Sequence, residues 1–156
     1  MPAIICDSPL GRLFLEEKDG GLCRLQVLAS EERKTSSEDP PTELLDEARC
    51  QLAAYFAGKL RRFDLPLNME GTAFQHQVWA SLRSIGYGTV KTYGDIAREV
   101  GSPFACRAVG MACHRNPVPI VVPCHRVVGV GGKLTGFAYG VEVKRFLLGL
   151  EKTILC

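Results

Sequence analysis

Residues 116–127 read Asn-Pro-Val-Pro-Ile-Val-Val-Pro-Cys-His-Arg-Val, so that a cysteine and a histidine directly follow a run of apolar residues. This order predicts a junction between an extended segment and a helix, with Cys124 sheltered from water and beside the imidazole of His125. A buried thiol is usually inert, but a neighbouring base or a helix N-terminus can make it a nucleophile. The segment therefore predicts a reactive thiol, and an inert buried cysteine is the alternative.

The composition is that of an ordinary globular protein. The chain has 156 residues, of which 46% are hydrophobic, enough for one compact domain or two small lobes. No apolar run approaches the roughly 18 residues of a membrane span, and the first residues lack the pattern of a signal peptide. Seven cysteines without regular spacing suit a reducing compartment. We expect a cytoplasmic protein, or a nuclear one in a eukaryote, with no membrane contact.

Charge is distributed unevenly along the chain. Residues 1–69 carry 9 Lys and Arg against 12 Asp and Glu, whereas residues 70–156 carry 10 against 5. The basic half is compatible with phosphate binding, although a solvated face with extra lysines is the more frequent explanation.

The first half of the chain predicts an α/β lobe over residues 1–69. Alternating runs at residues 12–16 and 22–28, separated by Lys-Asp-Gly-Gly at 18–21, predict an antiparallel hairpin. Residues 31–41 are polar and predict a mobile loop. Apolar residues at helical spacing over residues 42–56 predict a helix that covers the sheet.

The second half, residues 70–156, predicts a mainly helical domain. Thr72 and Gln75 form a capping box for a helix that turns Val78 and Trp79 inward. Thr92 caps a short helix that ends near residue 100, and Ser102-Pro103 opens another that runs to about residue 114. Two short helices joined by a tight turn predict a helix-turn-helix.

The second of these helices carries small residues and one long cation, Arg107. A helix that reads bases in the major groove usually presents several long polar side chains, and this one does not. Small residues allow a close approach to a shallow groove, and Arg107 could fill the space left by an extruded base. The alternative is a core-packed helix with Arg107 reaching to the solvent.

Residues 74–151 resemble the O6-alkylguanine-DNA alkyltransferases. The resemblance is carried by Tyr-Gly-Asp-Ile-Ala at 93–97, Arg-Ala-Val-Gly at 107–110, Asn-Pro-Val-Pro at 116–119 and Pro-Cys-His-Arg-Val at 123–127. Residues 7–11 extend it weakly to the first half. The resemblance implies an α+β fold, with a ribonuclease-H-like N-terminal lobe that contains an antiparallel sheet. It implies a winged-helix or helix-turn-helix-like C-terminal domain that binds DNA and accepts the alkyl group.

The resemblance also implies a chemistry: one irreversible transfer of an alkyl group, mainly methyl, from the 6-oxygen of guanine to Cys124. His125 would act as the base through a water molecule, Glu151 would orient it, and Asn116 would tie the turn before the acceptor. A helix N-terminus would raise the thiolate fraction of Cys124. Each protein molecule would act once, without a cofactor.

The implied partner is double-stranded DNA that contains alkylated guanine, bound through the minor groove with the nucleotide flipped out. The residues expected at the DNA are Tyr93, Arg107, Ala108, Gly110 and Arg126. Those expected around the flipped base are Tyr93, Val127, Phe137, Ala138, Tyr139 and Lys144. Tyr139 stands where some relatives have glycine, which predicts a narrow pocket that favours methyl over benzyl adducts. We expect a monomer; cooperative assembly on DNA, repair of alkylthymine and the role of residues 153–156 stay open.

No bound metal is expected. Some relatives hold a structural zinc in the first lobe, but Lys18 stands at one ligand position, and only Cys6 and Cys23 lie nearby in the sequence.

Three alternatives remain. A damage-recognition module of the same fold would lack the acceptor cysteine. A cysteine hydrolase would need an oxyanion-hole motif, which is not found around Cys124. A metal-binding protein would use Cys106, Cys113, His114, Cys124 and His125, but the usual spacing between ligands is missing.

Overall fold

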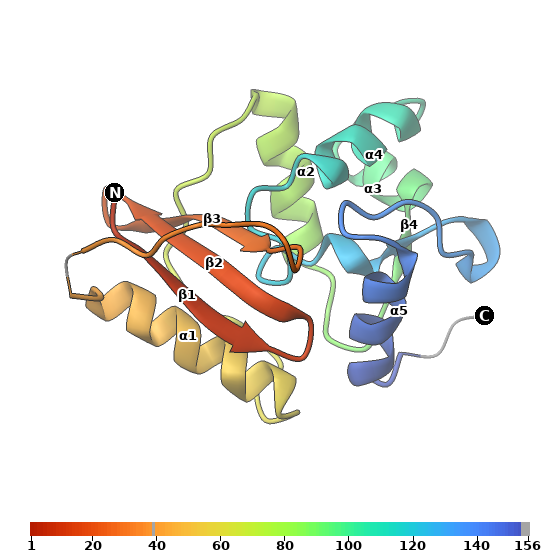
Figure 1. Ribbon diagram of the computed structural model, residues 1–156. Coiled ribbons are helices and arrows are strands. Elements are labelled where there is room, and N and C mark those ends of the chain that lie inside the picture. Colours follow the sequence, from red (N-terminus) through yellow and green to blue (C-terminus); the bar gives the residue numbers. More distant parts are fainter. Residues whose placement is uncertain (39, 154–156) are drawn as a thin grey trace. The chain divides into compact units, whose positions relative to one another are not determined.

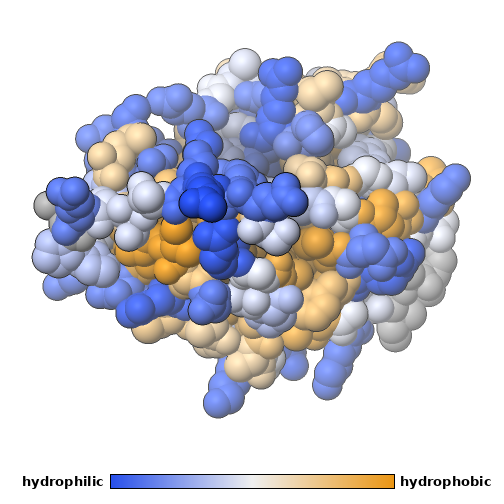
Figure 2. All heavy atoms as spheres, viewed as in Figure 1, coloured by the Kyte–Doolittle hydropathy of each residue, from blue (hydrophilic) through white to orange (hydrophobic). Residues whose placement is uncertain are grey.

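The computed structural model describes residues 1–38 and 40–153 (Figure 1). The chain divides into two compact units, with the boundary between Glu70 and Gly71. Within the described residues, no helix is both long and apolar enough to cross a membrane. Figure 2 shows hydrophilic side chains spread over the visible face, with smaller apolar areas between them.

The first unit is built on a three-stranded antiparallel sheet in the order β1 (Ala3–Ser8), β2 (Gly11–Lys18) and β3 (Gly21–Val27). The predicted hairpin is β2 and β3, which pair from Lys18 opposite Gly21 to Leu13 opposite Val27. Both turn residues have positive φ, 50° at Asp19 and 79° at Gly20. An Asp-Gly pair favours this left-handed geometry, which matches the twist of the two strands.

Helix α1 (Glu43–Phe56) packs along the sheet, as predicted (Figure 1). The Thr42 hydroxyl caps it by accepting a hydrogen bond from the Leu45 amide, and the helix buries one apolar face. That face meets the buried side chains of β2 and β3; the participants are Leu45, Ala48, Leu52, Tyr55, Leu13, Leu15, Leu22 and Leu25. Residues 31–38, 40 and 41 contain no helix or strand.

The second unit is mainly helical. Its elements are α2 (Ala73–Arg83), β4 (Lys91–Thr92), α3 (Tyr93–Glu99), α4 (Cys106–His114), the 3-10 helix η1 (Cys124–Arg126), β5 (Val127–Val128), the 3-10 helix η2 (Val130–Gly132) and α5 (Val141–Leu150). The capping boxes of α2 at Thr72 and of α3 at Thr92 are both present. Trp79 of α2 is buried and donates its indole N–H to the Ala112 carbonyl of α4 at 2.9 Å, so the two helices share a core.

Helix α4 begins at Cys106, later than the sequence predicts. Ser102 donates its amide to the Ala97 carbonyl at 2.9 Å and therefore belongs to the end of α3. The Ala105 amide then bonds to the Ser102 carbonyl in a tight turn, and Ala105 stands at the N-cap without a capping side chain. The proline pattern at 102–103 thus marks the turn between α3 and α4, whose packing gives the helix-turn-helix.

The Thr72 cap offers a test of local stability. Thr72→Ala removes the hydroxyl that accepts from the Gln75 amide and should lower the free energy of unfolding by about 1 kcal/mol. Urea unfolding followed by Trp79 fluorescence measures this change. Thr72→Ser keeps the hydroxyl and serves as the control; an equal loss in both variants would show that the cap has no such role.

Candidate active site

A cavity of about 210 Å³ opens beside Cys124 in the second unit. Its walls come from the start of α3, from α4, from η1 and from the loop before α5. The lining residues are Tyr93, Gly110, Cys113, His114, Cys124, Thr135, Gly136, Phe137 and Ala138. Residues predicted for DNA binding and for the substrate pocket therefore meet the predicted acceptor at one cavity.

Cys124 is the first residue of η1 and is only 4% exposed. Burial raises the pKa of its thiol to about 11, against the opposing effects of the Asn116 amide and the Lys144 charge. The sequence predicts extra thiolate from a helix N-terminus, but η1 has only three residues and supplies too few aligned peptide dipoles. At neutral pH the resting thiol is protonated, so a base must remove its proton during reaction.

Asn116 clamps the turn that leads to Cys124. Its amide nitrogen donates to the Val122 carbonyl at 2.8 Å, and its oxygen accepts from the Val118 amide at 3.0 Å. Between these two points Ile120 has a φ of 75°, a left-handed conformation that is unusual for a β-branched residue. Such strain costs on the order of 1–3 kcal/mol and persists only where the surroundings fix it. The Asn116 clamp provides that restraint immediately before the acceptor.

His125 is fully buried and pairs with Glu151. The distance between His125 Nε2 and Glu151 Oε2 is 2.7 Å, whereas Nδ1, also buried, has no hydrogen-bond partner among the described residues. Burial lowers the pKa of His125, although the Glu151 carboxylate opposes the shift. The imidazole is therefore neutral at pH 7, and one of its ring nitrogens has an unused hydrogen-bonding position.

Arg126 lies in a different environment from the one that the sequence predicts. It was expected at the DNA, but its side chain is 7% exposed and forms an ion pair with Glu151. Its guanidinium also donates to the Ile85 carbonyl at 2.7 Å. With its donors committed inside the protein, Arg126 is not available to a phosphate or a base.

Tyr93 and Lys144 hold the loop that closes one side of the cavity. Both donate to the Thr135 carbonyl, Tyr93 Oη at 3.2 Å and Lys144 Nζ at 3.1 Å, and Lys144 also reaches the Gly136 carbonyl at 3.4 Å. Burial raises the pKa of Tyr93 and lowers that of Lys144. Lys144 is thus behind the wall of the cavity and does not line it.

Two other predicted pocket residues do not line the cavity. Val127 is fully buried in β5, paired in parallel with β4. Tyr139 packs against Phe137, with ring centroids 6.1 Å apart, and it is Phe137 that lines the cavity. Tyr139 therefore contacts a residue of the cavity wall without lining the cavity itself.

Sequence reasoning missed Cys113 and His114 as pocket residues. They lie three and four positions after Gly110 on α4, so helical spacing puts them on the side that Gly110 presents to the cavity. Cys113 is a second thiol in the pocket, but burial raises its pKa to about 12. Like Cys124, it is therefore protonated at neutral pH.

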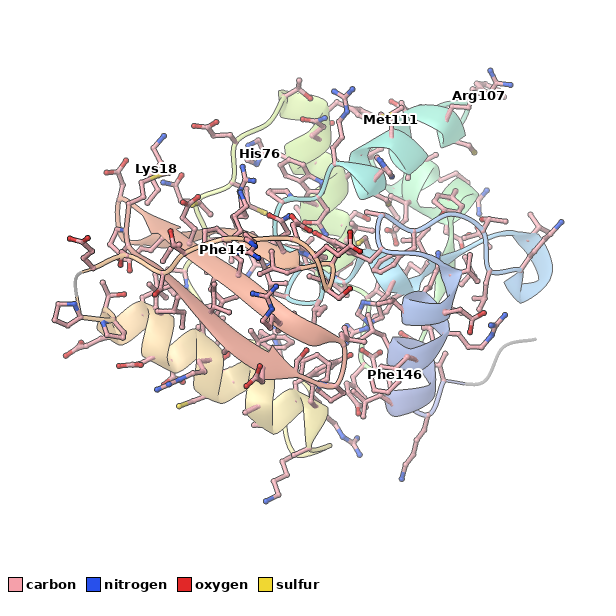
Figure 3. All side chains as sticks on the ribbon, in the orientation of Figure 1. Phe14, Lys18, His76, Arg107, Met111 and Phe146 are labelled. Carbon is pink, nitrogen blue, oxygen red and sulfur yellow. The ribbon has the colours of Figure 1, made fainter. Side chains whose placement is uncertain are left out.

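Arg107 and Ala108, in the first turn of α4, are both exposed. Figure 3 shows Arg107 pointing away from the protein at the end of this helix. Gly110, one turn further on, borders the cavity. One face of α4 thus runs from an exposed cation to the acceptor pocket.

Family models match both units. The DNA binding domain of 6-O-methylguanine DNA methyltransferase matches residues 73–153, and the ribonuclease-like domain of the same protein matches residues 3–69. The chain belongs to the 6-O-methylguanine DNA methyltransferase family. The α+β fold expected from the sequence is that of the family.

Relatives and solved structures agree with this membership in the methyltransferase family. The chain is 47% identical to the methylated-DNA–protein-cysteine methyltransferase of Methanosarcina acetivorans, over 94% of this chain and 96% of the relative. It is 45% identical to the constitutive enzyme of that name in Bacillus subtilis, over 94% and 92%. The structure of Mycobacterium tuberculosis OGT in complex with DNA is similar, with a TM-score of 0.85, 47% identity and coverage of 95% of this chain and 91% of that one.

The metal-binding alternative finds no support in this geometry. Within residues 1–38 and 40–153, no group of three or more His, Cys, Asp and Glu side chains is arranged to hold a metal ion. Cys106 is exposed, whereas Cys113 and Cys124 are buried.

The resting state of the acceptor predicts slow reaction with small electrophiles. A pKa of about 11 lowers the thiolate fraction at neutral pH about 100-fold relative to the ordinary value of 9.0. In a Cys156→Ser background, a pulse of iodoacetamide at pH 7.5 should label the exposed Cys50 and Cys106 at least about 100-fold faster than Cys124. Peptide mass spectrometry measures each rate. Labelling of Cys124 as fast as Cys50 would contradict the protonated, buried thiol.

Proposed function

We propose that this protein repairs DNA by transferring an alkyl group, mainly methyl, from the 6-oxygen of guanine to its own Cys124. The observation that carries the proposal is the Cys124 thiol at a cavity of about 210 Å³, next in the chain to the buried His125–Glu151 pair. Family membership supports the same reaction, as does the name of the relatives, methylated-DNA–protein-cysteine methyltransferase. The transfer is stoichiometric and irreversible because it ends in a thioether.

The reaction needs one proton to leave the thiol and one to reach the guanine. Neutral His125 takes the Cys124 proton through a water molecule, and Glu151 stabilises the imidazolium that forms. The Cys124 sulfur then attacks the alkyl carbon, an S–C bond forms, and the bond between carbon and the guanine oxygen breaks. Tyr93, which lines the cavity, gives up its hydrogen bond to the Thr135 carbonyl and donates that proton to the departing purine; it regains a proton from water, to which the His125 imidazolium releases its own. The balance of atoms requires no cofactor.

The substrate is a nucleotide flipped out of double-stranded DNA. A base inside a duplex cannot reach a buried thiol, and extrusion costs a few kcal/mol, less where alkylation has weakened the pair. The small residues of α4, with Ala108 and Gly110 among them, suit close approach to the minor groove, and the exposed Arg107 fills the vacated stack. The protein acts as a monomer in this proposal.

In this proposal the cavity accepts methyl adducts better than benzyl adducts. Phe137 and Ala138 line the cavity, and the Tyr139 ring packs against Phe137. This second ring resists displacement of Phe137, which a bulky adduct would require.

Mass spectrometry tests the proposal directly. After incubation with a duplex that contains O6-methylguanine, the Cys124 peptide should gain 14 Da, the mass of CH2 in place of hydrogen, with one methyl group transferred per protein molecule. Cys124→Ala should gain nothing and repair nothing. A non-catalytic recognition module would bind the DNA and leave every peptide unmodified. Methylation of the Cys113 peptide in place of the Cys124 peptide would show that Cys124 is not the acceptor.

Arg107 should matter for the duplex and not for the free base. Arg107→Ala removes the side chain that occupies the vacated stack, so flipping becomes less favourable. Because flipping costs a few kcal/mol, we expect methyl transfer from duplex DNA to be at least about tenfold slower. Transfer from free O6-methylguanine should be unchanged. Arg83→Ala, which removes an exposed charge from α2, controls for general electrostatics. Equal losses on both substrates would exclude the stack-filling role.

A further inference from the structure

We propose that Arg126 is a positioning residue for the transfer, because its guanidinium holds the Glu151 carboxylate and thereby keeps His125 neutral with its proton on Nε2. The inference rests on the proposed function, in which His125 is the base. It assigns a role to the one predicted DNA-binding residue that the structure turns inward.

The contacts form a buried network around one carboxylate. Arg126 binds Glu151 with two nitrogens, Nε to Oε1 at 2.9 Å and Nη2 to Oε2 at 3.0 Å. The Gly88 amide also donates to Oε1, at 3.3 Å, and the guanidinium carbon lies 5.8 Å from the centre of the Tyr87 ring. Glu151 is only 2% exposed. The two-point contact fixes both the position and the plane of the carboxylate.

This arrangement determines which nitrogen of His125 carries the proton. An ionised carboxylate only accepts hydrogen bonds, so the 2.7 Å contact between Glu151 Oε2 and His125 Nε2 requires a hydrogen on Nε2. In a neutral imidazole the other nitrogen then bears a lone pair. That nitrogen, Nδ1, is the one without a protein partner among the described residues. It is free to accept the proton of the thiol.

Charge balance explains why the carboxylate needs a cation other than His125. With Arg126 paired to it, Glu151 is neutralised and His125 can stay uncharged in a site where burial disfavours charge. Without the guanidinium, the carboxylate would face the imidazole alone and would draw a proton onto it. The charged groups that act on His125 are Glu151 at the end of α5, Arg126 beside it in η1 and Lys144 from α5. An imidazole that is already protonated cannot act as a base.

The pH profile of methyl transfer distinguishes this role from a merely structural one. Arg126→Met should move the acid limb of the rate profile up by about one pH unit, since removal of a cation near His125 raises the imidazole pKa. Arg126→Lys keeps the charge and should leave the limb near its original position, although the rate falls because an ammonium cannot hold both oxygens. Arg145→Met, at an exposed residue of α5 paired with Glu142, is the matched control and should change neither rate nor profile.

Nitrogen-15 NMR of the histidines tests the inference even if Arg126→Met folds poorly. The chain has three histidines, His76, His114 and His125, so single substitutions assign their signals. In the wild-type protein His125 should remain in the neutral Nε2–H form as the pH is lowered through 6.5, the pKa of an ordinary imidazole. In Arg126→Lys this form should persist, and in Arg126→Met the imidazolium should appear at a pH about one unit higher.

The outcomes separate this inference from the proposed function. If the wild-type Cys124 peptide gains no methyl group, the proposed function fails, whatever the spectra show. If the wild-type protein is methylated but the acid limb and the His125 signals stay unmoved in Arg126→Met and Arg126→Lys, Arg126 only supports the fold and the inference is overturned. A wild-type His125 protonated on Nδ1 at pH 7 would also overturn it.

Discussion

The buried Glu151 carboxylate is the interaction on which the geometry of the second unit depends. Through Arg126 and the Gly88 amide it connects the segment after α2, η1 and the end of α5. Burial of an ion pair of this kind contributes little net stability, because the cost of desolvation offsets much of the attraction. The ion pair matters instead because it orients the side chains around it. A carboxylate with all its contacts satisfied gives the neighbouring imidazole one orientation, and the segment from Asn116 to Arg126 is fixed at the end that carries the acceptor.

Burial has two opposite consequences for Cys124. It suppresses ionisation, with the pKa raised to about 11, which protects a thiol that can be used only once from reaction with unrelated electrophiles. It also removes the water that would otherwise solvate the attacking sulfur. A buried, protonated thiol therefore needs a base that the protein itself supplies. Cys113 shares the burial, which raises its pKa to about 12, so both thiols of the pocket are protonated at rest.

The sequence predicted the turns and helix starts that depend on interactions between nearby residues. The hairpin follows from Asp19-Gly20, and the starts of α1, α2 and α3 follow from Thr42, Thr72 and Thr92, because a turn or a cap is decided within four residues. The Cys124-His125 pair was found from its place directly after an apolar run, whereas Glu151 was found through the resemblance to a family, and the structure brings His125 and Glu151 into contact across 26 positions. Arg126 was misassigned because an arginine beside an active site has the same sequence appearance whether it faces DNA or a buried carboxylate. Only the position of Glu151 decides between the two.

The strained turn at Ile120 is held in place by the residues around it. Pro119 and Pro123 restrict the backbone on either side, and the Asn116 side chain bonds to both ends of the turn, so the left-handed φ of Ile120 is imposed from outside. A relaxed turn could shift the acceptor by an ångström without changing any element of the fold. Transfer of an alkyl group requires the sulfur, the carbon and the departing oxygen to be aligned, and such alignment tolerates little displacement. The strain is thus the cost of holding Cys124 still, from the Asn116 side, while the Glu151 network holds it from the other.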